Sequence, residues 1–226
     1  MDTNALNLFD KIYLVNLKRR PDRLDEFYKN NAAYVKNLDI EVFEAIEGKL
    51  VQDDEWKFNK GALGCWKSHI ELLKIIEKSD FDKVLILEDD ALIVDKKSLE
   101  CEEVKNFIIE EKWDMFYFGF EHFKPPSLLS ENIQKLNWAL QTHAYAVNRA
   151  SVSKIIRYAE MRKYWIDGIF AEIHSFMNCY ATTKNTIIQT ASKSDITPKT
   201  TFWRILYLKA SSILRKMLKM IKKFDS

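Results

Sequence analysis

The stretch KVLILEDDALIV, residues 83–94, places three adjacent carboxylates between two apolar runs. The first run has the length and composition of a buried strand. A surface turn after it would contain Gly, Pro, Asn or Ser, and this stretch contains none of them. Glu88, Asp89 and Asp90 are therefore expected at the tip of a strand, in apolar surroundings. Carboxylates this close stay ionised only with water, hydrogen-bond donors or a cation nearby. Oxygen ligands without a Cys or His cluster beside them favour Mg²⁺ or Mn²⁺.

Further short apolar runs alternate with helical patterns along the 226 residues. Strands are expected over residues 11–17, 38–48, 84–87, 113–120, 143–148 and 185–190, and helices over residues 61–78, 150–162 and 165–178. This alternation predicts an α/β fold. The chain has only five glycines, and three of them, Gly48, Gly61 and Gly64, fall within seventeen residues. This concentration predicts a backbone that turns tightly or approaches a ligand there.

The composition is that of an ordinary globular protein, 47% apolar and 30% charged. The cysteines, Cys65, Cys101 and Cys179, are widely spaced and form no CxxC motif, so we expect reduced thiols in a cytosolic protein. The first residues do not have the pattern of a signal peptide. No apolar run reaches the roughly 18 residues of a membrane span.

A basic segment follows the expected strand at residues 11–17. Lys18, Arg19, Arg20 and Arg23 crowd this position, and Pro21 is expected to stop regular structure. In open α/β sheets, ligands bind beyond the carboxyl ends of the strands. The segment therefore suits a phosphate, and a solvated charged turn is the alternative.

Two expected helices carry polar residues of interest. Ser68 and His69 are adjacent and do not face one another on a helix, which argues against a hydrolytic Ser–His pair; His69 alone is a packing or a catalytic histidine. In the helix expected over 165–178, Asp167, His174 and Asn178 share one flank, since seven residues are close to two turns. This flank either faces solvent or points a carboxylate and an imidazole into a cleft, for base catalysis or metal binding.

Three segments, in order, resemble glycosyltransferase family 25, which contains bacterial lipooligosaccharide galactosyltransferases and collagen galactosyltransferases. They are IYLVNLKRRPDR, EAIEG followed by GALGCWKSH, and VLILEDDALI. A weaker fourth match is THAYAVNRASVSKI followed by Asp167. The similarity covers roughly residues 11–195. The chain departs from the family at NKGA, where Ala62 stands in place of the usual acid.

The resemblance implies a single GT-A-like domain over residues 1–196, with a Rossmann-like mixed sheet flanked by helices. It implies inverting transfer of a hexose, galactose from UDP-galactose, to a lipooligosaccharide. The metal ligands implied are Glu88, Asp89 and Asp90, with His174 as a further candidate, for Mn²⁺ or Mg²⁺. Asp167 is the candidate general base, and Asp90 is also taken as catalytic. The residues implied in binding the UDP-sugar donor are Asn16, Leu17, Arg19, Arg20, Arg23, Ala45, Gly48, Ser68, His69 and Asp89. His143 is a candidate supporting group.

Two other functions stay open on the sequence alone. One is a galactosyl- or glucosyltransferase that modifies hydroxylysine in a collagen-like protein. The other is an inactive nucleotide-sugar-binding protein associated with a membrane. The intact acidic signature Glu88–Asp90 argues against loss of activity, but the donor sugar and the acceptor are decided by few residues in variable loops.

The C-terminal residues 202–226 differ from the rest of the chain. They hold seven Lys and Arg against one Asp, a net charge of +6, which leaves −4 for the preceding residues. Their pattern predicts a basic amphipathic helix suited to an anionic membrane surface. The alternative is a helix docked on the domain or in a dimer interface. We expect a cytoplasmic protein peripheral to the inner face of the cytoplasmic membrane, and no nucleic-acid partner, because no recognisable binding module is present.

Overall fold

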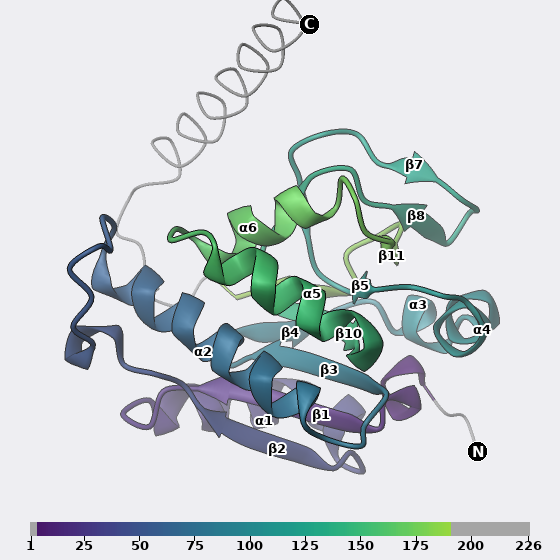
Figure 1. The fold of residues 1–226 in the computed structure, drawn as a ribbon. Helices are drawn as coiled ribbons and strands as arrows, with labels where there is room; N and C mark the ends of the chain where they lie inside the picture. Colours follow the sequence, from purple (N-terminus) through teal and green to yellow (C-terminus); the bar gives the residue numbers. More distant parts are fainter. Residues whose placement is uncertain (1–3, 191–226) are drawn as a thin grey trace, which may run out of the picture. The chain divides into compact units, whose positions relative to one another are not determined.

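The computed structural model describes residues 4–190 of the chain. Figure 1 shows them as a central sheet with helices on both faces. The helices are η1 (Ala5–Leu8), α1 (Pro21–Val35), η2 (Gly48–Leu50), α2 (Lys60–Glu77), α3 (Lys96–Glu100), α4 (Glu102–Glu110), α5 (Arg149–Glu160) and α6 (Ile166–Ile173). The strands are β1 (Lys11–Asn16), β2 (Ile40–Glu44), β3 (Lys83–Glu88), β4 (Ala91–Ile93), β5 (Met115–Tyr117), β6 (Glu121–His122), β7 (Ser127–Leu128), β8 (Ile133–Lys135), β9 (Ala139–Leu140), β10 (Ala144–Asn148), β11 (Cys179–Thr182) and β12 (Ile187–Gln189).

Eight strands of the described residues form one mixed sheet in the order β2-β1-β3-β10-β5-β11-β8-β7. β1 lies between β2 and β3 and is parallel to both, with Leu14 opposite Val42 and Leu87. β10 runs antiparallel to β3 and β5. Two small antiparallel pairs, β4 with β12 and β6 with β9, complete the strands described. The predicted α/β fold with a mixed sheet flanked by helices is confirmed.

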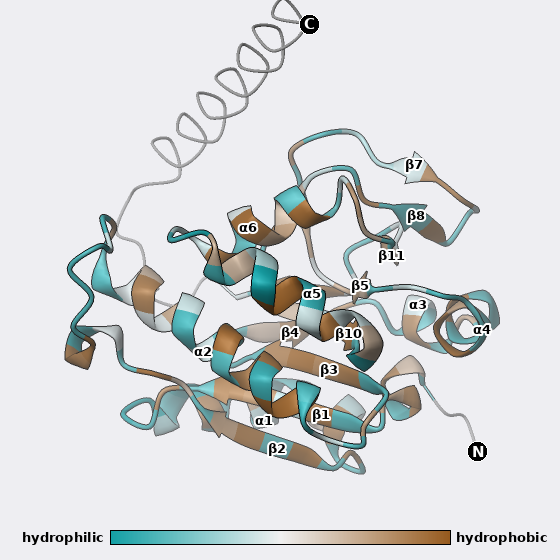
Figure 2. Cartoon of the chain, in the orientation of Figure 1, coloured by the Kyte–Doolittle hydropathy of each residue, from teal (hydrophilic) through white to brown (hydrophobic). Residues whose placement is uncertain are grey.

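Alternate residues of the central strands face opposite sides of the sheet. On one side, Leu14, Leu85 and Phe116 belong to a buried apolar cluster that also contains Phe27 of α1 and Val104 of α4. Figure 2 shows the apolar character of β3 within this core. This packing anchors the amino-terminal half of the sheet, whose strand ends carry the acidic stretch.

Helices α2, α5 and α6 pack on the other side of the sheet. Figure 1 shows α2 and α5 side by side in front of the strands, and the two helices are in contact. Tyr145 of β10 meets Phe170 of α6 with ring centroids 5.3 Å apart. His69 of α2 lies against both rings. The α2 helix therefore brings His69 onto the sheet rather than into solvent.

Helix α1 begins where the sequence was expected to lose regular structure. Pro21 is its first residue, a position where the missing proline N–H removes no helical hydrogen bond. The expectation that Pro21 stops regular structure is therefore wrong. The consequence is that Arg23 belongs to a helix and is buried, whereas the sequence pattern placed it in a basic loop.

Two of the clustered glycines meet where η2 crosses α2. A Cβ atom on Gly48 would lie 1.7 Å from the carbonyl oxygen of Lys60, and one on Gly64 would lie 2.5 Å from that of Ile46. Ser68 fastens the same crossing, because its hydroxyl donates to Gly64 O at 2.7 Å and accepts from Ile46 N at 2.8 Å. The close approach expected from the glycines is thus one of backbone to backbone.

The helix expected over 165–178 is shorter than the sequence indicated. It ends at Ile173, and every residue of α6 is buried. Asn178 lies beyond the helix, where its backbone N–H donates to Asp114. A solvent-facing polar flank on α6 is therefore excluded.

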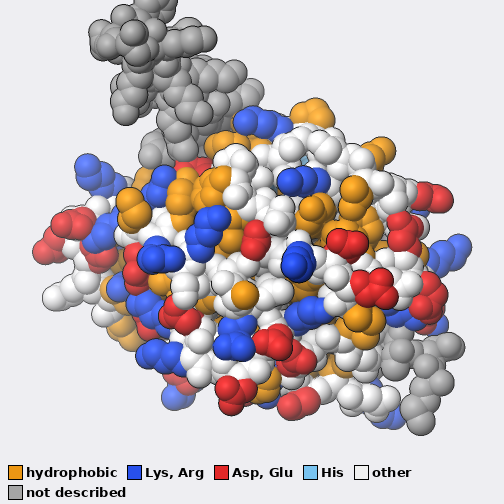
Figure 3. All heavy atoms as spheres, turned by 45° about the vertical axis from the view of Figure 1, so that its right-hand side comes forward, with side chains coloured by type: hydrophobic (Ala, Val, Ile, Leu, Met, Phe, Trp, Pro, Cys, Tyr) orange, Lys and Arg blue, Asp and Glu red, His pale blue; other side chains and the backbone are white. Residues whose placement is uncertain are grey.

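The boundary expected near residue 196 and the amphipathic helix expected over 202–226 lie outside the described residues. Within residues 4–190, the helices are too short or too polar to cross a membrane. On the face drawn in Figure 3, Lys and Arg side chains are interspersed with Asp and Glu. This face of the described chain offers no broad single-sign patch that would attract a polyanion by charge alone.

Candidate active site

The acidic stretch lies at the carboxyl edge of two adjacent parallel strands. Glu88 is the last residue of β3, and Asn16 is the last residue of β1. The backbone N–H of Asp89 donates to the carbonyl oxygen of Val15 at 3.2 Å, which joins the two strand ends. This edge is where open α/β sheets bind their ligands.

Arg23 of α1 binds both aspartates of the stretch. Its Nη2 lies 2.7 Å from Asp89 Oδ1 and 2.8 Å from Asp90 Oδ2. The three side chains are only 9%, 8% and 11% exposed, respectively. One guanidinium thus faces two carboxylates in a largely dry setting, and it balances the charge of one of them.

The other basic residues of the segment have separate acidic neighbours. Lys18 pairs with Glu44 at 3.4 Å, Arg19 with Glu47 at 2.8 Å and Arg20 with Asp22 at 2.7 Å. Of the four bases expected to form one phosphate site, Arg23 forms ion pairs with both aspartates, and the charge of Arg20 also acts on Asp89 by lowering its pKa.

Burial, together with neighbouring negative charge, raises the pKa values of the two aspartates. Burial, the largest influence, raises the pKa of Asp89 to about 7; Arg23 opposes this rise, while Asp90 and Glu88 add to it. Burial and then the Glu88 carboxylate raise the pKa of Asp90, against the opposing effects of Arg23 and a hydrogen bond from Gln189. Desolvation and like charges both disfavour the ionised forms, so a further cation at this edge would stabilise them.

Two buried oxygen atoms at this edge have no hydrogen-bond partner. They are Asp90 Oδ1 and Asn16 Oδ1. The other terminal atom of each side chain is engaged: Asp90 Oδ2 accepts from Gln189 at 3.0 Å, and Asn16 Nδ2 donates to the carbonyl oxygen of Leu17 at 3.0 Å. A buried acceptor without a partner is destabilising by about 1–3 kcal/mol, and oxygen atoms of this kind are the ligands that Mg²⁺ and Mn²⁺ take.

Glu88 turns to the opposite face from Arg23 and joins a separate network. Its Oε1 accepts from Thr142 Oγ1 at 2.6 Å and lies 3.3 Å from His69 Nε2. His69 Nδ1 lies 2.9 Å from the hydroxyl of Tyr145. Burial acts most strongly on Glu88 and raises its pKa, but the His69 and Thr142 interactions outweigh burial and hold the pKa below its ordinary value. Glu88 is therefore the acid of the stretch that stays ionised most readily.

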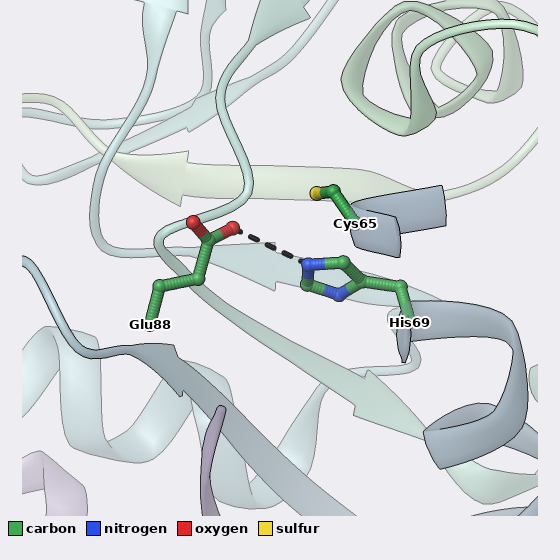
Figure 4. A group of neighbouring side chains, drawn as sticks. All are labelled: Cys65, His69 and Glu88. Atoms are coloured by element: carbon green, nitrogen blue, oxygen red, sulfur yellow. Dashed lines mark hydrogen bonds and ion pairs between the residues drawn. The ribbon is translucent and has the colours of Figure 1, made fainter. Parts of the chain in front are cut away.

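Cys65, one helical turn before His69, completes this second group (Figure 4). A sulfur, a ring nitrogen and a carboxylate oxygen from Cys65, His69 and Glu88 lie within 4.8 Å of one another. In the part of the chain that the structure describes, the three consecutive acids do not converge in this way. The fold divides the acidic stretch into an aspartate pair facing Arg23 and a glutamate facing His69.

Asp167 and His174 hold residues 139–142, which comprise β9 and the two residues after it. Asp167 Oδ2 accepts from the backbone N–H of Gln141 at 3.4 Å, and His174 Nδ1 accepts from that of Ala139 at 3.2 Å. Gln141 has φ 80°, a left-handed conformation that few residues other than glycine adopt. The next residue, Thr142, is the one that binds Glu88. Asp167 is thus connected to the acidic stretch through this segment.

His174 is placed away from the three acids. Its Nε2 lies 3.2 Å from the hydroxyl of Tyr117, so both ring nitrogens have protein partners. Burial, followed by the neighbouring His122, lowers the pKa of His174 to about 3. The imidazole is neutral at physiological pH and fixed in one orientation by its two contacts.

Two of the remaining predicted donor residues, Leu17 and Ala45, lie at the end of β1. Ala45 N donates to the carbonyl oxygen of Asn16 at 2.8 Å, and Arg20 N donates to that of Leu17 at 2.8 Å. Gly48 and Ser68 belong to the glycine crossing described above. His143, the candidate supporting group, donates from Nε2 to Ile187 O at 3.0 Å.

Four residues of the site were not identified from the sequence: Cys65, Thr142, Tyr145 and Gln189. The spacing of Cys65 and His69, four residues apart, would place them on one face of a helix and could have indicated the pair. Thr142, Tyr145 and Gln189 carry no comparable signal, because their partners Glu88, His69 and Asp90 lie far away in the sequence.

The family model of glycosyltransferase family 25 (LPS biosynthesis protein) matches residues 9–170. The chain therefore belongs to glycosyltransferase family 25, and the resemblance seen in the sequence is confirmed. It is 23% identical to procollagen galactosyltransferase 2 of Mus musculus over 173 residues, which cover 66% of this chain and 27% of that protein. It is 22% identical to the inactive glycosyltransferase 25 family member 3 of Homo sapiens over 180 residues, which cover 69% of this chain and 30% of that protein. The chain thus matches less than a third of the length of these relatives.

Solved structures that superpose on this chain include two galactosyltransferases. A mutant of Drosophila β1,4-galactosyltransferase 7 in complex with manganese, UDP-Gal and xylobiose gives a TM-score of 0.45 at 14% identity, covering 86% of this chain and 78% of that one. Galactosyltransferase LgtC in complex with donor and acceptor sugar analogs gives 0.43 at 11% identity, covering 89% and 95%. Because both scores are below 0.5, the assignment to the family rests on the family model alone.

Proposed function

We propose that this protein transfers a hexose from a UDP-sugar to a saccharide acceptor with the help of a divalent cation. The observation that carries the proposal is the pair of unpartnered buried oxygens, Asp90 Oδ1 and Asn16 Oδ1, at the carboxyl edge of β1 and β3. A cation together with a nucleotide diphosphate would supply the partners that both atoms lack. Because the chain belongs to a glycosyltransferase family, the reaction that we propose for this edge is glycosyl transfer.

Asp89 and Asp90 are the residues that would hold the cation, Mn²⁺ or Mg²⁺. Their donor atoms are hard oxygens, and Arg23 balances only one of their two charges. When bound, the cation would neutralise the charge that develops on the departing UDP. Arg23 would remain beside the diphosphate and would keep the two aspartates at a fixed separation from the strand ends.

Asp167 is the proposed general base. Inversion at the sugar requires a group that removes the proton of the acceptor hydroxyl on the side opposite the leaving group. Asp167 is a buried carboxylate, and its contact with Gln141 N connects it to the segment that binds Glu88 through Thr142. This placement supports a role at the site rather than on the protein surface.

Galactose from UDP-galactose is the proposed donor and a lipooligosaccharide the proposed acceptor. The family description names LPS biosynthesis, and the relatives include proteins named procollagen galactosyltransferase. These names also support the second candidate acceptor, hydroxylysine in a collagen-like protein. A panel of UDP-sugars, assayed for UDP release with lipooligosaccharide and with a collagen peptide, separates the two.

A protein that binds a nucleotide sugar without turning it over is the remaining alternative. It is favoured by the contact of Arg23 with both aspartates, since a guanidinium can replace a metal ion as their counter-charge. Relatives named inactive match the chain as well. Release of UDP that depends on both Mn²⁺ and acceptor would exclude this alternative, and UDP binding without release would establish it.

The proposed location is the inner face of the cytoplasmic membrane, to which residues 202–226 would attach the domain. Their net charge of +6 supports attraction to anionic lipids. A lipid-linked saccharide acceptor would then be held close to the site. Sedimentation with anionic vesicles, compared with neutral vesicles, tests this part of the proposal.

A further inference from the structure

The side chains of Cys65, His69 and Glu88 form a cluster that the proposed transfer reaction does not explain. Figure 4 shows the thiol and the carboxylate directed toward the space beside the edge of the imidazole that carries Nε2. Cys65 and Glu88 are half-buried and His69 is buried, so the cluster borders on solvent. Hard cations such as Mn²⁺ have little preference for a thiolate, whereas Zn²⁺ takes sulfur, imidazole nitrogen and carboxylate oxygen together.

The separation of the nitrogen and oxygen ligand atoms matches that in a tetrahedral zinc site. Zn–N and Zn–O bonds of about 2.0–2.1 Å at a tetrahedral angle place the two ligand atoms roughly 3.3 Å apart. The measured distance between His69 Nε2 and Glu88 Oε1 is 3.3 Å. The Cys65 sulfur lies within 4.8 Å of a ring nitrogen of His69 and of a carboxylate oxygen of Glu88.

Tyr145 provides the outer support that zinc-binding histidines need. A histidine that binds metal through Nε2 donates its Nδ1 proton to a neighbouring group, and His69 Nδ1 lies 2.9 Å from the Tyr145 hydroxyl. Burial, followed by the charges of Glu88 and Cys65, raises the pKa of Tyr145 well above its ordinary value, so this hydroxyl stays protonated. It can accept as well as donate, so the imidazole can carry its proton on Nδ1 and present a lone pair at Nε2.

We propose that Cys65, His69 and Glu88 form a binding site for a borderline-soft divalent cation, Zn²⁺, with the fourth position open to water. The site is distinct from the Asp89–Asp90 edge in ligand chemistry, although Glu88 adjoins both. Binding releases the thiol proton of Cys65 to solvent, and the one ring proton of the neutral His69 imidazole stays on Nδ1, which leaves the Nε2 lone pair for the cation. No change of oxidation state is involved.

The test is titration of the full-length protein with Co²⁺, a spectroscopic substitute for Zn²⁺, under a non-thiol reductant. We expect a near-ultraviolet sulfur-to-cobalt charge-transfer band, visible bands of tetrahedral intensity, and loss of both on addition of Zn²⁺. A wild-type spectrum without the sulfur band would overturn the proposal. Cys65→Ser should remove the band, and Cys101→Ser, which alters another half-buried thiol, should retain it. A band that survives in Cys65→Ser or disappears in Cys101→Ser would also overturn the assignment.

Two further variants separate this site from the proposed active site and from a packing role. Tyr145→Phe keeps the ring but removes the contact with Nδ1, and should weaken Co²⁺ binding about 10–100-fold, the usual effect of losing such a partner; unchanged affinity would contradict the proposed arrangement. Asp90→Asn should keep the cobalt spectrum while it loses Mn²⁺-dependent UDP binding. Loss of the cobalt spectrum in Asp90→Asn would instead assign the bound ion to the aspartate edge and refute a separate zinc site.

Discussion

Asp89→Asn should stabilise the protein at neutral pH in the presence of EDTA. The pKa of Asp89 is raised from 3.8 to about 7, chiefly by burial. Between about pH 4 and pH 7, the folded protein therefore keeps a proton on this group that the unfolded chain has lost. The free energy of unfolding of the wild type falls as the pH rises through this window, by about 1.36 kcal/mol for each pH unit between the two pKa values. The two values lie roughly three pH units apart, so the total loss is about 4 kcal/mol.

Asparagine has the shape of the protonated acid and no charge to lose. We expect equal free energies of unfolding for the variant and the wild type near pH 4, and an advantage for the variant that grows to about 4 kcal/mol at pH 7 and above. Arg23 keeps its contact with Asp90 in the variant. Urea unfolding followed by tryptophan fluorescence, at intervals from about pH 4 to about pH 8, measures the difference directly. EDTA is required because a bound cation would stabilise the ionised carboxylate.

A control of opposite sign is Asp95→Asn. The hydrogen bond from Ser98 leads the influences that lower the pKa of Asp95, so this carboxylate stabilises the fold above its unfolded pKa. The stabilisation is lost as the pH falls through the folded pKa. The Asp95 variant should thus be less stable than the wild type at pH 7 and approach it in acid. An Asp89 variant that is no more stable than the wild type at pH 8 would refute the view that these carboxylates are under-compensated.

Three other predictions concern the charges and the tail. Arg23→Ala should lower the free energy of unfolding by about 3–5 kcal/mol, because it leaves buried carboxylates without their partner. Arg20 pairs with Asp22, whose side chain is 64% exposed, so Arg20→Ala should change the free energy of unfolding by no more than about 1 kcal/mol. Equal urea midpoints for the two variants would contradict this. Asp167→Asn should lower turnover by about 10²–10⁴-fold, the usual contribution of a general base, with UDP affinity unchanged, and near wild-type turnover would remove Asp167 from that role. A chain ending near Ile196 should keep UDP binding and lose affinity for anionic vesicles, most clearly at low salt; vesicle binding equal to that of the full chain would assign the membrane contact elsewhere.

The elements that were predicted from the sequence are those with strong local patterns. The apolar run before Glu88 forms β3, and the helical pattern over residues 61–78 forms α2. The clustered glycines indicated a close approach, which the structure shows at Gly48 and Gly64. In each case the information lies in neighbouring residues, so periodicity and glycine content were sufficient.

Helix α1 was missed because a polar residue interrupts its apolar face. Asn31 stands where an apolar residue would continue the pattern, and it is buried. Its side chain binds the backbone of β4, accepting from Ile93 N at 2.8 Å and donating to the carbonyl oxygen of Ala91 at 2.9 Å. A tertiary contact thus replaced the local signal, and without the helix the burial of Arg23 could not be foreseen.

The contacts of the site residues could not be predicted, because they depend on how strands far apart in the sequence pair. Asp167 and His174 were predicted to share one flank of a helix. Nothing in the sequence indicated that residues 139–142 would be their partner. The same limit applies to Thr142, which reaches Glu88 because β10 pairs with β3. Sheet order fixes these contacts, and the sequence pattern carries no direct record of sheet order.

The measurement that tests the central claim is UDP binding by calorimetry with Mn²⁺ and with EDTA, for the wild type and Asp90→Asn. If the unpartnered oxygen of Asp90 binds a cation that holds the diphosphate, Mn²⁺ should raise the UDP affinity of the wild type by at least about tenfold, an interaction of about 1.4 kcal/mol. In Asp90→Asn, the affinities with Mn²⁺ and with EDTA should be equal. Wild-type UDP affinity that is the same with EDTA as with Mn²⁺ would contradict the account, and the arginine side chains would then be sufficient counter-charge for the two aspartates.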